Sequence, residues 1–176
     1  MPKSSKEGKS EIVNWCKELT DVSTIVDIGA GSGTYYKLLA KKNKVFSSST
    51  WIAIEAWSNY ITQYQLDEKY NRVINQDARS VKFTDIGDID LTIMGDMLEH
   101  MTKEDAIALV NEVSKSSRYA IISIPIIHYP QDEYEGNPFE VHVKDDWSHT
   151  EVMETFPNII KTFEGQEIGC YLLKFK

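Results

Sequence analysis

The stretch around position 100 holds the side chains with the clearest chemical potential. It reads Gly-Asp-Met-Leu-Glu-His-Met from position 95, so Asp96, Glu99 and His100 fall at i, i+3 and i+4. A single helical turn would place all three side chains on one face. Carboxylates and imidazoles together suit a divalent ion such as Mg, Mn, Fe, Co or Zn, and an imidazole can also act as a base. The stretch therefore predicts either a metal site or a proton-transfer site.

A second histidine, His142, lies in the long segment 126–147, which is rich in aromatic residues and contains two prolines. Loops of this length in compact domains are usually functional or disordered, and the aromatic content argues against disorder. His142 can fold back over the first three side chains, because the strands that precede the two segments are expected to be neighbours. The candidate metal ligands are Asp96, Glu99, His100 and His142, and the candidate catalytic residues are His100 and His142.

The other stretch that could do chemistry is an acid followed by glycines. Asp27 stands before Gly29, Gly31 and Gly33, and a short apolar, β-branched run leads into them. Glycines let the backbone turn tightly and approach a ligand. A P-loop is excluded because no Gly-Lys-Ser/Thr follows, and Thr34 stands where the dinucleotide fingerprint needs a glycine. An acid here would repel a pyrophosphate, yet it could anchor the ammonium of an amino-acid moiety, directly or through water.

With this acid-G-x-G-x-G motif, the sequence resembles the class I S-adenosylmethionine-dependent methyltransferases over nearly the whole chain. The resemblance implies S-adenosylmethionine as the cofactor. It also implies that Glu55, after the second expected strand, binds the ribose hydroxyls, and that Asp77 and Ala78, after the third, face the adenine. The residues expected to bind the cofactor are Asp27, Gly29, Ala30, Gly31, Gly33, Glu55, Ala56, Asp77, Ala78 and Asp96.

Glu55 carries the most direct expectation of this set. We expect it to face solvent at the end of its strand, so that Glu55→Ala weakens cofactor binding and leaves stability nearly unchanged. The alternative is an ordinary surface glutamate, although its place directly after an apolar strand favours a binding role.

The residues after the fourth expected strand narrow the acceptor class. Amino methyltransferases of nucleic-acid bases carry Asn/Asp-Pro-Pro-Tyr/Phe there, whereas this chain has Gly-Asp-Met-Leu. The block from Asp96 to His100 looks like that of small-molecule O-methyltransferases of the ubiquinone pathway. It is also similar to that of the small-RNA 3′-end 2′-O-methyltransferases, which hold a divalent metal with a downstream histidine. Asp96 departs from both by being one methylene shorter than their first glutamate. The resemblance favours a small-molecule acceptor oxygen, and an RNA 3′ end stays open.

Alternating strands and helices must position these residues. Apolar β-branched runs predict strands at residues 24–28, 50–54, 72–75, 90–94 and 119–124. Helices are predicted at 10–20, 35–42, weakly at 58–69, and after the capping residues Thr102 and Ser148, and a closing hairpin at 158–163 and 168–175. The pattern predicts an α/β fold in three layers. Its doubly wound, mostly parallel, seven-stranded sheet would have an antiparallel last strand, as in the Rossmann-like methyltransferase fold.

The composition bounds the class of protein. The 176 residues suit one domain, 1–176, with residues 1–9 as a frayed tail. A net charge of −8, from 19 basic and 27 acidic residues, disfavours a broad phosphate-binding surface. Cys16 and Cys170 show neither metal spacing nor a disulfide framework. The sequence shows no signal peptide and no apolar run long enough for a bilayer. We expect a cytoplasmic protein without a membrane partner, and a homodimer stays open.

Two further functions stay open beside the methyltransferase. One is a non-catalytic binding subunit that keeps the fold, although such a subunit would not need the intact glycine motif and Glu55. The other is a nicotinamide-dependent enzyme, which Thr34 disfavours.

Overall fold

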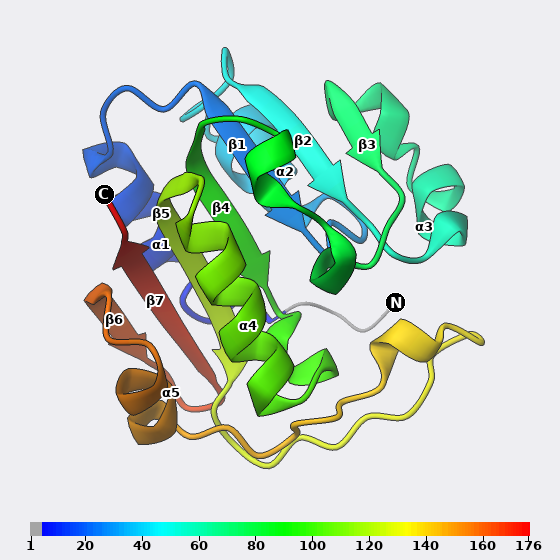
Figure 1. Ribbon diagram of the computed structural model, residues 1–176, viewed down its shortest axis with the longest axis vertical. Helices are drawn as coiled ribbons and strands as arrows, with labels where there is room; N and C mark the ends of the chain where they lie inside the picture. The colour runs from blue at the N-terminus through cyan, green and yellow to red at the C-terminus, as the bar shows by residue number, and fades with distance from the viewer. Residues whose placement is uncertain (1–4) are drawn as a thin grey trace.

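Five apolar segments pair as parallel strands, and a C-terminal hairpin completes the sheet. The computed structural model describes residues 5–176, and its sheet has the order β3-β2-β1-β4-β5-β7-β6 (Figure 1). The strands are β1 (Thr24–Ile28), β2 (Thr50–Ile54), β3 (Arg72–Ile74), β4 (Ile89–Gly95), β5 (Ser117–Pro125), β6 (Ile159–Glu164) and β7 (Ile168–Lys174). Strand β7 is antiparallel to both β5 and β6, whereas the other neighbours are parallel. The predicted fold class is confirmed.

The three strands in the middle of the sheet end together. Ile28, the last residue of β1, is level with Ile54 of β2 and with Met94 of β4. The residues that follow these strands therefore share one edge of the sheet, the edge at which open α/β sheets bind their ligands. The glycine turn, Glu55 and Asp96 all lie there.

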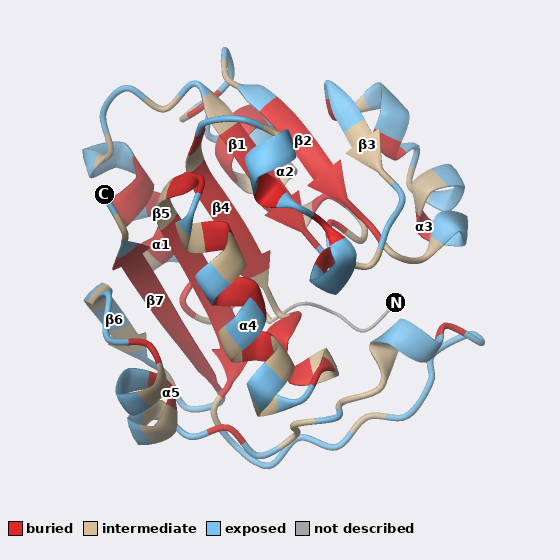
Figure 2. Cartoon of the chain, in the orientation of Figure 1, coloured by how far each residue is buried: buried red, intermediate tan, exposed pale blue. Residues whose placement is uncertain are grey.

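Helices cover both faces of the sheet. The α-helices and the π-helix are α1 (Lys9–Glu18), α2 (Thr34–Tyr36), the π-helix η1 (Lys37–Lys42), α3 (Ser58–Gln63), α4 (Lys103–Ser114) and α5 (His149–Thr155). The 3₁₀ turns are η2 (Leu66–Glu68), η3 (Ala78–Ser80), η4 (Phe83–Asp85), η5 (Leu98–His100) and η6 (Pro138–Glu140). One apolar cluster joins α4 and α5 to one sheet face, and a second joins α1 and η1 to the other. The central strands between these layers are buried over most of their length (Figure 2).

Helices α4 and α5 begin where the sequence predicts. The Thr102 side chain accepts a hydrogen bond from the Asp105 N–H at 3.1 Å, and the Ser148 side chain accepts one from the Glu151 N–H at 3.1 Å. Each side chain satisfies an N–H group that has no partner inside its helix. Both predicted caps are confirmed.

Two other helical segments differ from the prediction. Residues 35–42, predicted as one helix, continue from α2 into the π-helix η1, in which hydrogen bonds span five residues instead of four. Residues 58–69, predicted as weakly helical, divide into α3 and η2, because Gln65 between them has a left-handed φ of 51°. Neither difference displaces the strands that carry the candidate site.

Residues 126–147, here called the roof loop, fold back on themselves. The two halves of the loop meet where the His142 N–H donates to the Gln131 carbonyl at 3.0 Å. The returning half is fixed beside η5, because the Val143 N–H donates to the Glu99 carbonyl at 2.8 Å. The backbone of the roof loop is therefore attached directly to the stretch that carries Glu99, and this attachment brings His142 close to it.

The segment before α1 is held to the C-terminal hairpin. The Glu7 carboxylate accepts hydrogen bonds from the backbone N–H groups of Gln166, Glu167 and Ile168, which lower the pKa of Glu7. The predicted frayed tail is therefore wrong for residues 5–9, and residues 1–4 lie outside the described part of the chain. Between residues 5 and 176, no helix is long and apolar enough to cross a membrane.

Candidate active site

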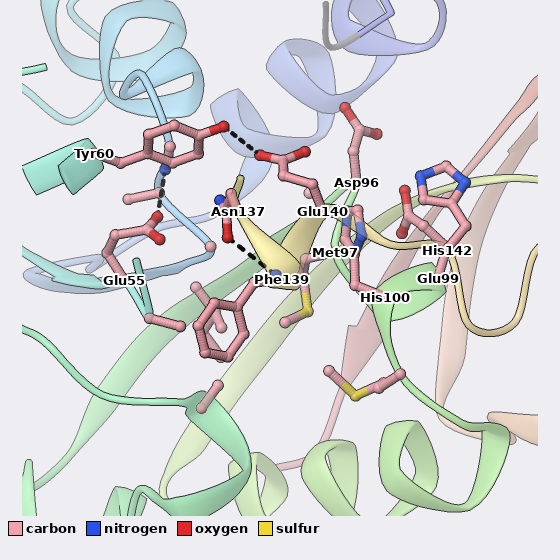
Figure 3. A pocket seen from close by; sticks show the side chains of 18 of the residues that line it. Glu55, Tyr60, Asp96, Met97, Glu99, His100, Asn137, Phe139, Glu140 and His142 are labelled. Atoms are coloured by element: carbon pink, nitrogen blue, oxygen red, sulfur yellow. Dashed lines mark hydrogen bonds between the residues drawn. The ribbon is translucent and has the colours of Figure 1, made fainter. Parts of the chain in front are cut away.

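A cavity of about 380 Å³ opens at the carboxyl edge of the sheet. The glycine turn, the end of β2 and η3 line one half, and η5 and the roof loop line the other (Figure 3). The predicted residues that line it are Gly29, Ala30, Gly31, Glu55, Ala56, Asp77, Ala78, Asp96, Glu99, His100 and His142. Most of the predicted site is thus gathered around one space.

The glycine turn after β1 needs glycine for its backbone geometry. Gly29, Gly31 and Gly33 have φ values of 66°, 49° and 74°, which side chains with a Cβ rarely adopt. A Cβ on Gly29 would also lie 3.2 Å from the Met97 Cβ. A Cβ on Gly33 would lie 3.5 Å from the Tyr70 hydroxyl. Gly33 shapes the turn and does not line the cavity, and its predicted contact with the cofactor stays a prediction.

Asp27 lies beneath the glycine turn instead of in the cavity wall. Its exposed fraction is 2%, and its Oδ2 accepts a hydrogen bond from the Tyr70 hydroxyl at 2.5 Å. Burial raises the pKa of Asp27 to about 7, and the Tyr70 hydrogen bond opposes part of this rise. Asp27 therefore does not line the cavity as predicted, and its contact with a cofactor ammonium, directly or through water, stays a prediction.

Glu55 is buried, with an exposed fraction of 5%, so the expectation that it faces solvent is wrong. Its Oε2 accepts a hydrogen bond from the Gly31 N–H at 2.9 Å, and its Oε1 accepts one from the Trp57 N–H at 2.9 Å. Burial raises the pKa of Glu55, and the two backbone hydrogen bonds partly lower it. The carboxylate fixes the glycine turn and still lines the cavity, and each oxygen keeps acceptor capacity for a ribose hydroxyl.

Asp77 lines the cavity, and its carboxylate is paired with Arg79. Arg79 donates to it from Nε at 3.0 Å and from a terminal nitrogen at 2.6 Å, and this pairing lowers the pKa of Asp77. Arg79 also lies 3.3 Å from Asp105 of α4. Ala78 is buried beside Asp77, so the predicted acid and small residue are adjacent in the cavity wall.

The chain turns sharply at Asp96, where φ is 53°. A helical turn therefore does not start there, and Asp96 does not share one face with the residues that follow. The Ser123 hydroxyl donates to its Oδ1 at 2.7 Å, and the Lys9 ammonium lies 3.6 Å from its Oδ2. Within residues 5–176, Asp96 is outside the carboxylate–histidine group described next. The structure thus brings three of the four predicted metal ligands together, and the metal itself stays a prediction.

Glu99, His100 and His142 come together, with one ligand atom of each lying within 4.8 Å of the others (Figure 3). The centroids of the two imidazoles are 4.8 Å apart. The His100 Nδ1 lies 3.2 Å from the Val141 carbonyl, and the His142 Nδ1 is hydrogen bonded to the Tyr129 carbonyl. Because a carbonyl only accepts, each Nδ1 carries a proton, and the Nε2 of an uncharged ring in this arrangement presents a lone pair.

Burial shifts the pKa values of Glu99 and His100. Glu99 has an exposed fraction of 2%, and within the described chain its Oε2 has no hydrogen-bond partner. Burial, with a smaller contribution from the charge of Asp96, raises the pKa of Glu99 well above its ordinary value. Burial and the neighbouring His142 lower the pKa of His100 to about 4, so His100 is uncharged at neutral pH. A buried carboxylate oxygen without a partner suits a bound cation or a proton.

The roof loop adds residues to the site that no local sequence pattern indicated. The Tyr60 hydroxyl donates to the Glu140 Oε1 at 2.8 Å, and the Gln131 Nε2 donates to the Glu140 carbonyl at 2.6 Å. Buried Asn137 accepts a hydrogen bond from the Phe139 N–H at 3.0 Å and so begins η6. These four roof-loop residues and Tyr60 of α3 line the cavity. The only sequence signal for the roof-loop residues was the aromatic content of residues 126–147, and it did not identify them individually.

The glycine turn, the acids after β2 and β3, and the sheet order together define a class I S-adenosylmethionine-dependent methyltransferase fold. Residues 26–119, more than half of the chain, match the family model described as a methyltransferase domain. The chain therefore belongs to the methyltransferase-domain family, and the predicted family is confirmed. No curated protein matches the chain.

Solved structures of methyltransferases share this fold. An S-adenosylmethionine-dependent methyltransferase from Clostridium acetobutylicum has a TM-score of 0.71 at 13% identity, with 99% of this chain and 93% of that chain covered. One from Aquifex aeolicus has a TM-score of 0.67 at 13% identity, with 98% and 95% covered. Magnesium protoporphyrin IX methyltransferase from Synechocystis, with S-adenosylmethionine bound, has a TM-score of 0.67 at 14% identity, with 97% and 79% covered. At these identities the likeness is one of fold.

Proposed function

We propose that this protein transfers the methyl group of S-adenosylmethionine to an oxygen atom of a small acceptor molecule. The observation that carries the proposal is the single cavity that joins Gly31 and Glu55 to Glu99, His100 and His142. Membership of the methyltransferase-domain family supports the reaction class. The Synechocystis neighbour, which binds S-adenosylmethionine, supports the choice of cofactor.

The half of the cavity beside the glycine turn suits the cofactor. The Glu55 oxygens accept hydrogen bonds from the ribose hydroxyls, as the buried position at the end of β2 allows. Asp77 and Ala78, which line this half, would contact the adenine, and Gly29 and Gly31 would let the amino-acid moiety come close to the backbone. Bound S-adenosylmethionine supplies an electrophilic methyl group, and its sulfur keeps the electron pair of the broken S–C bond to give S-adenosylhomocysteine.

The other half suits an acceptor hydroxyl that must lose its proton. As the acceptor oxygen forms its bond to the methyl carbon, the Nε2 of His142 takes the hydroxyl proton. The His142 Nδ1–H is held by the Tyr129 carbonyl, which fixes the ring for this role. His100, kept neutral by its lowered pKa, offers its Nε2 as a second acceptor and orients the hydroxyl.

Calorimetric titration with S-adenosylmethionine and S-adenosylhomocysteine tests the cofactor assignment. We expect dissociation constants on the order of 1–100 μM. Neither heat nor a thermal shift at millimolar ligand would contradict the assignment.

A panel of small phenols, alcohols, amines and thiols, with a labelled methyl group on the cofactor, tests the acceptor atom. Oxygen acceptors should be labelled. His142→Ala should retain cofactor affinity while transfer falls about a hundredfold or more, the usual contribution of a positioned base. Labelling confined to amines or thiols would count against an oxygen acceptor.

A second candidate places a divalent ion between Glu99, His100 and His142. One observation is the buried Glu99 Oε2, which has no hydrogen-bond partner among residues 5–176. The other is that carbonyls hold the two Nδ1–H groups, the arrangement that orients Nε2 towards a metal. A bound ion there would lower the pKa of an acceptor hydroxyl.

Metal analysis of the pure protein, and titration of the chelator-treated protein with Mn²⁺ and Zn²⁺, test this candidate. One ion per chain is expected in the wild type, and His142→Ala should weaken its binding at least tenfold. If activity survives both chelation and His142→Ala, the ligand set is wrong.

A further inference from the structure

We propose that the middle of the cavity binds a positively charged group of its ligand and that Glu140 is the counter-ion of this group. The inference rests on the proposed function and specifies the charge of what the site accepts. It is carried by the charges around the cavity, by the placement of Glu140 and by the unsatisfied carboxylate of Glu99.

Carboxylates outnumber cations around the cavity. Among the lining residues between positions 5 and 176, the acids are Glu55, Asp77, Asp96, Glu99, Glu140 and Glu167, and Arg79 is the one arginine or lysine. Arg79 is already paired with Asp77 and Asp105. A phosphate or carboxylate group of a ligand would therefore meet charges of its own sign, whereas a cation would be attracted.

Two hydrogen bonds hold Glu140 at the cavity, one from α3 and one from within the roof loop. Turn η6 carries the residue, the Tyr60 hydroxyl from α3 donates to its Oε1 at 2.8 Å, and Gln131 holds its backbone carbonyl at 2.6 Å. Figure 3 shows Glu140 between the end that holds Glu55 and the end that holds Glu99. Burial is the main cause of the raised pKa of Glu55, and the charge of Glu140 adds to it. A cation bound among the three carboxylates would relieve their repulsion.

A second, independent observation points to the same kind of ligand. The Glu99 carboxylate lines the cavity with an exposed fraction of 2%, and its Oε2 has no hydrogen-bond partner in the described chain. Tyr60, Tyr129 and Phe139 add aromatic faces to the lining. Carboxylates together with aromatic faces are the usual surroundings of bound ammonium and sulfonium groups.

The cation can come from two sources, which share this chemistry. One is the cofactor, which carries a sulfonium and an ammonium group. The other is an acceptor with a protonated amine beside its hydroxyl. The variant that tests both is Glu140→Gln, because it removes the charge, keeps an oxygen that can accept from Tyr60, and leaves the Gln131 bond to the backbone intact. Glu133→Gln, on an exposed part of the same loop, is the matched control.

The first part of the test is calorimetry with S-adenosylmethionine and with S-adenosylhomocysteine. If the sulfonium is the bound cation, Glu140→Gln weakens S-adenosylmethionine binding about tenfold and S-adenosylhomocysteine binding less than about twofold. A loss of about tenfold for both ligands assigns the cation to their shared ammonium. Glu133→Gln should leave both affinities at the wild-type value.

The second part of the test is competition between two phenols, measured with S-adenosylhomocysteine bound. Tyramine carries a protonated amine, and p-hydroxyphenylpropionate carries a carboxylate in its place. If the cation belongs to the acceptor, the wild type prefers tyramine, and Glu140→Gln reduces this preference about tenfold without changing either cofactor affinity.

The inference is overturned if Glu140→Gln changes neither the cofactor affinities nor the tyramine preference, or if Glu133→Gln changes them as much. A wild-type protein that binds neither cofactor form would instead contradict the proposed function, and the inference with it. Normal cofactor binding with no effect of Glu140→Gln contradicts the inference alone.

Discussion

Glu55 stabilises the fold and also lines the candidate site. Its carboxylate accepts the N–H groups of Gly31 and Trp57, and these groups lose their acceptor in Glu55→Ala. We expect the free energy of unfolding to fall by about 1–3 kcal/mol and S-adenosylhomocysteine affinity to fall roughly tenfold or more. Denaturant unfolding and calorimetry measure the two effects, with exposed Glu68→Ala as the control. Unchanged affinity would refute the ribose assignment.

His100 gives the site a pH dependence with a definite sign. Its pKa is about 4 in the folded protein against an ordinary 6.5, so the unfolded chain takes up this proton at a higher pH. The stability that depends on neutral His100 is complete above pH 6.5 and is lost as the pH falls towards 4. In chelator-treated protein, we expect His100→Asn to lower the loss of unfolding free energy between pH 7 and pH 4 by up to about 3 kcal/mol. Parallel stability curves for the two proteins would exclude this shift.

Which residues belong to the candidate site was easier to predict from the sequence than how far each is buried and what it contacts. The acid–glycine motif is local in sequence, so Gly29 and Gly31 could be assigned to the site from their spacing. Glu55 could be assigned from the family resemblance and from its place directly after an apolar strand. The burial of Glu55 could not, because its partners come from the glycine turn and from Trp57. The left-handed turn at Asp96 was equally hidden, since a spacing of i, i+3 and i+4 does not show whether the first residue is helical.

Among the helices, strands and loops too, features set by local sequence could be predicted, whereas features set by distant contacts could not. Strands β1 and β2 have the predicted bounds because each is a short apolar, β-branched run between polar residues. The caps of α4 and α5 were predictable because each involves residues three positions apart. The roof loop has no periodic pattern, and its contact between Tyr60 and Glu140 joins residues 80 positions apart. Its function could be expected from its length, but its contacts could not.

The roof loop should control how fast a bound cofactor leaves. The Tyr60 hydroxyl is a direct hydrogen bond from α3 to the loop, and Tyr60→Phe removes it while retaining the ring. Because a hydrogen bond to a charged group contributes about 1.5–3 kcal/mol, we expect S-adenosylhomocysteine to dissociate about tenfold faster. Its association rate should change little, because the loop contacts form after encounter. Stopped-flow measurement of tryptophan fluorescence gives both rates.

The neighbouring Tyr64 provides the control for this variant. The centroids of the Tyr64 and Tyr60 rings are 5.2 Å apart, and Tyr64→Phe removes a hydroxyl from the residue directly after α3. Its kinetics should match the wild type. Equal dissociation rates in all three proteins would mean that the Tyr60–Glu140 contact does not hold the loop closed over the ligand.

At the scale of the whole molecule, the net charge and the fold should both favour the binding of cationic ligands at the cavity. The parallel strands deliver their following residues to one edge of the sheet, and the acids among those residues surround the cavity. The net charge of −8 adds a long-range field of the same sign. We therefore expect the molecule to attract cationic ligands from a distance and to repel polyanions, including the phosphates next to an RNA 3′ end.

This field leads to a prediction about RNA, the acceptor that the sequence left open. A short single-stranded RNA with a free 3′ hydroxyl should show neither methylation nor binding at about 100 μM, even in low salt, where attraction between opposite charges is least screened. Filter binding and transfer of a labelled methyl group measure the two outcomes, with a basic RNA-binding domain as the positive control. Proteins that contact phosphates lose affinity steeply as salt is raised, because counterions are released on binding. Measurable RNA binding with such a salt slope would show that a basic surface overcomes the net charge, and it would restore the RNA 3′ end as the acceptor.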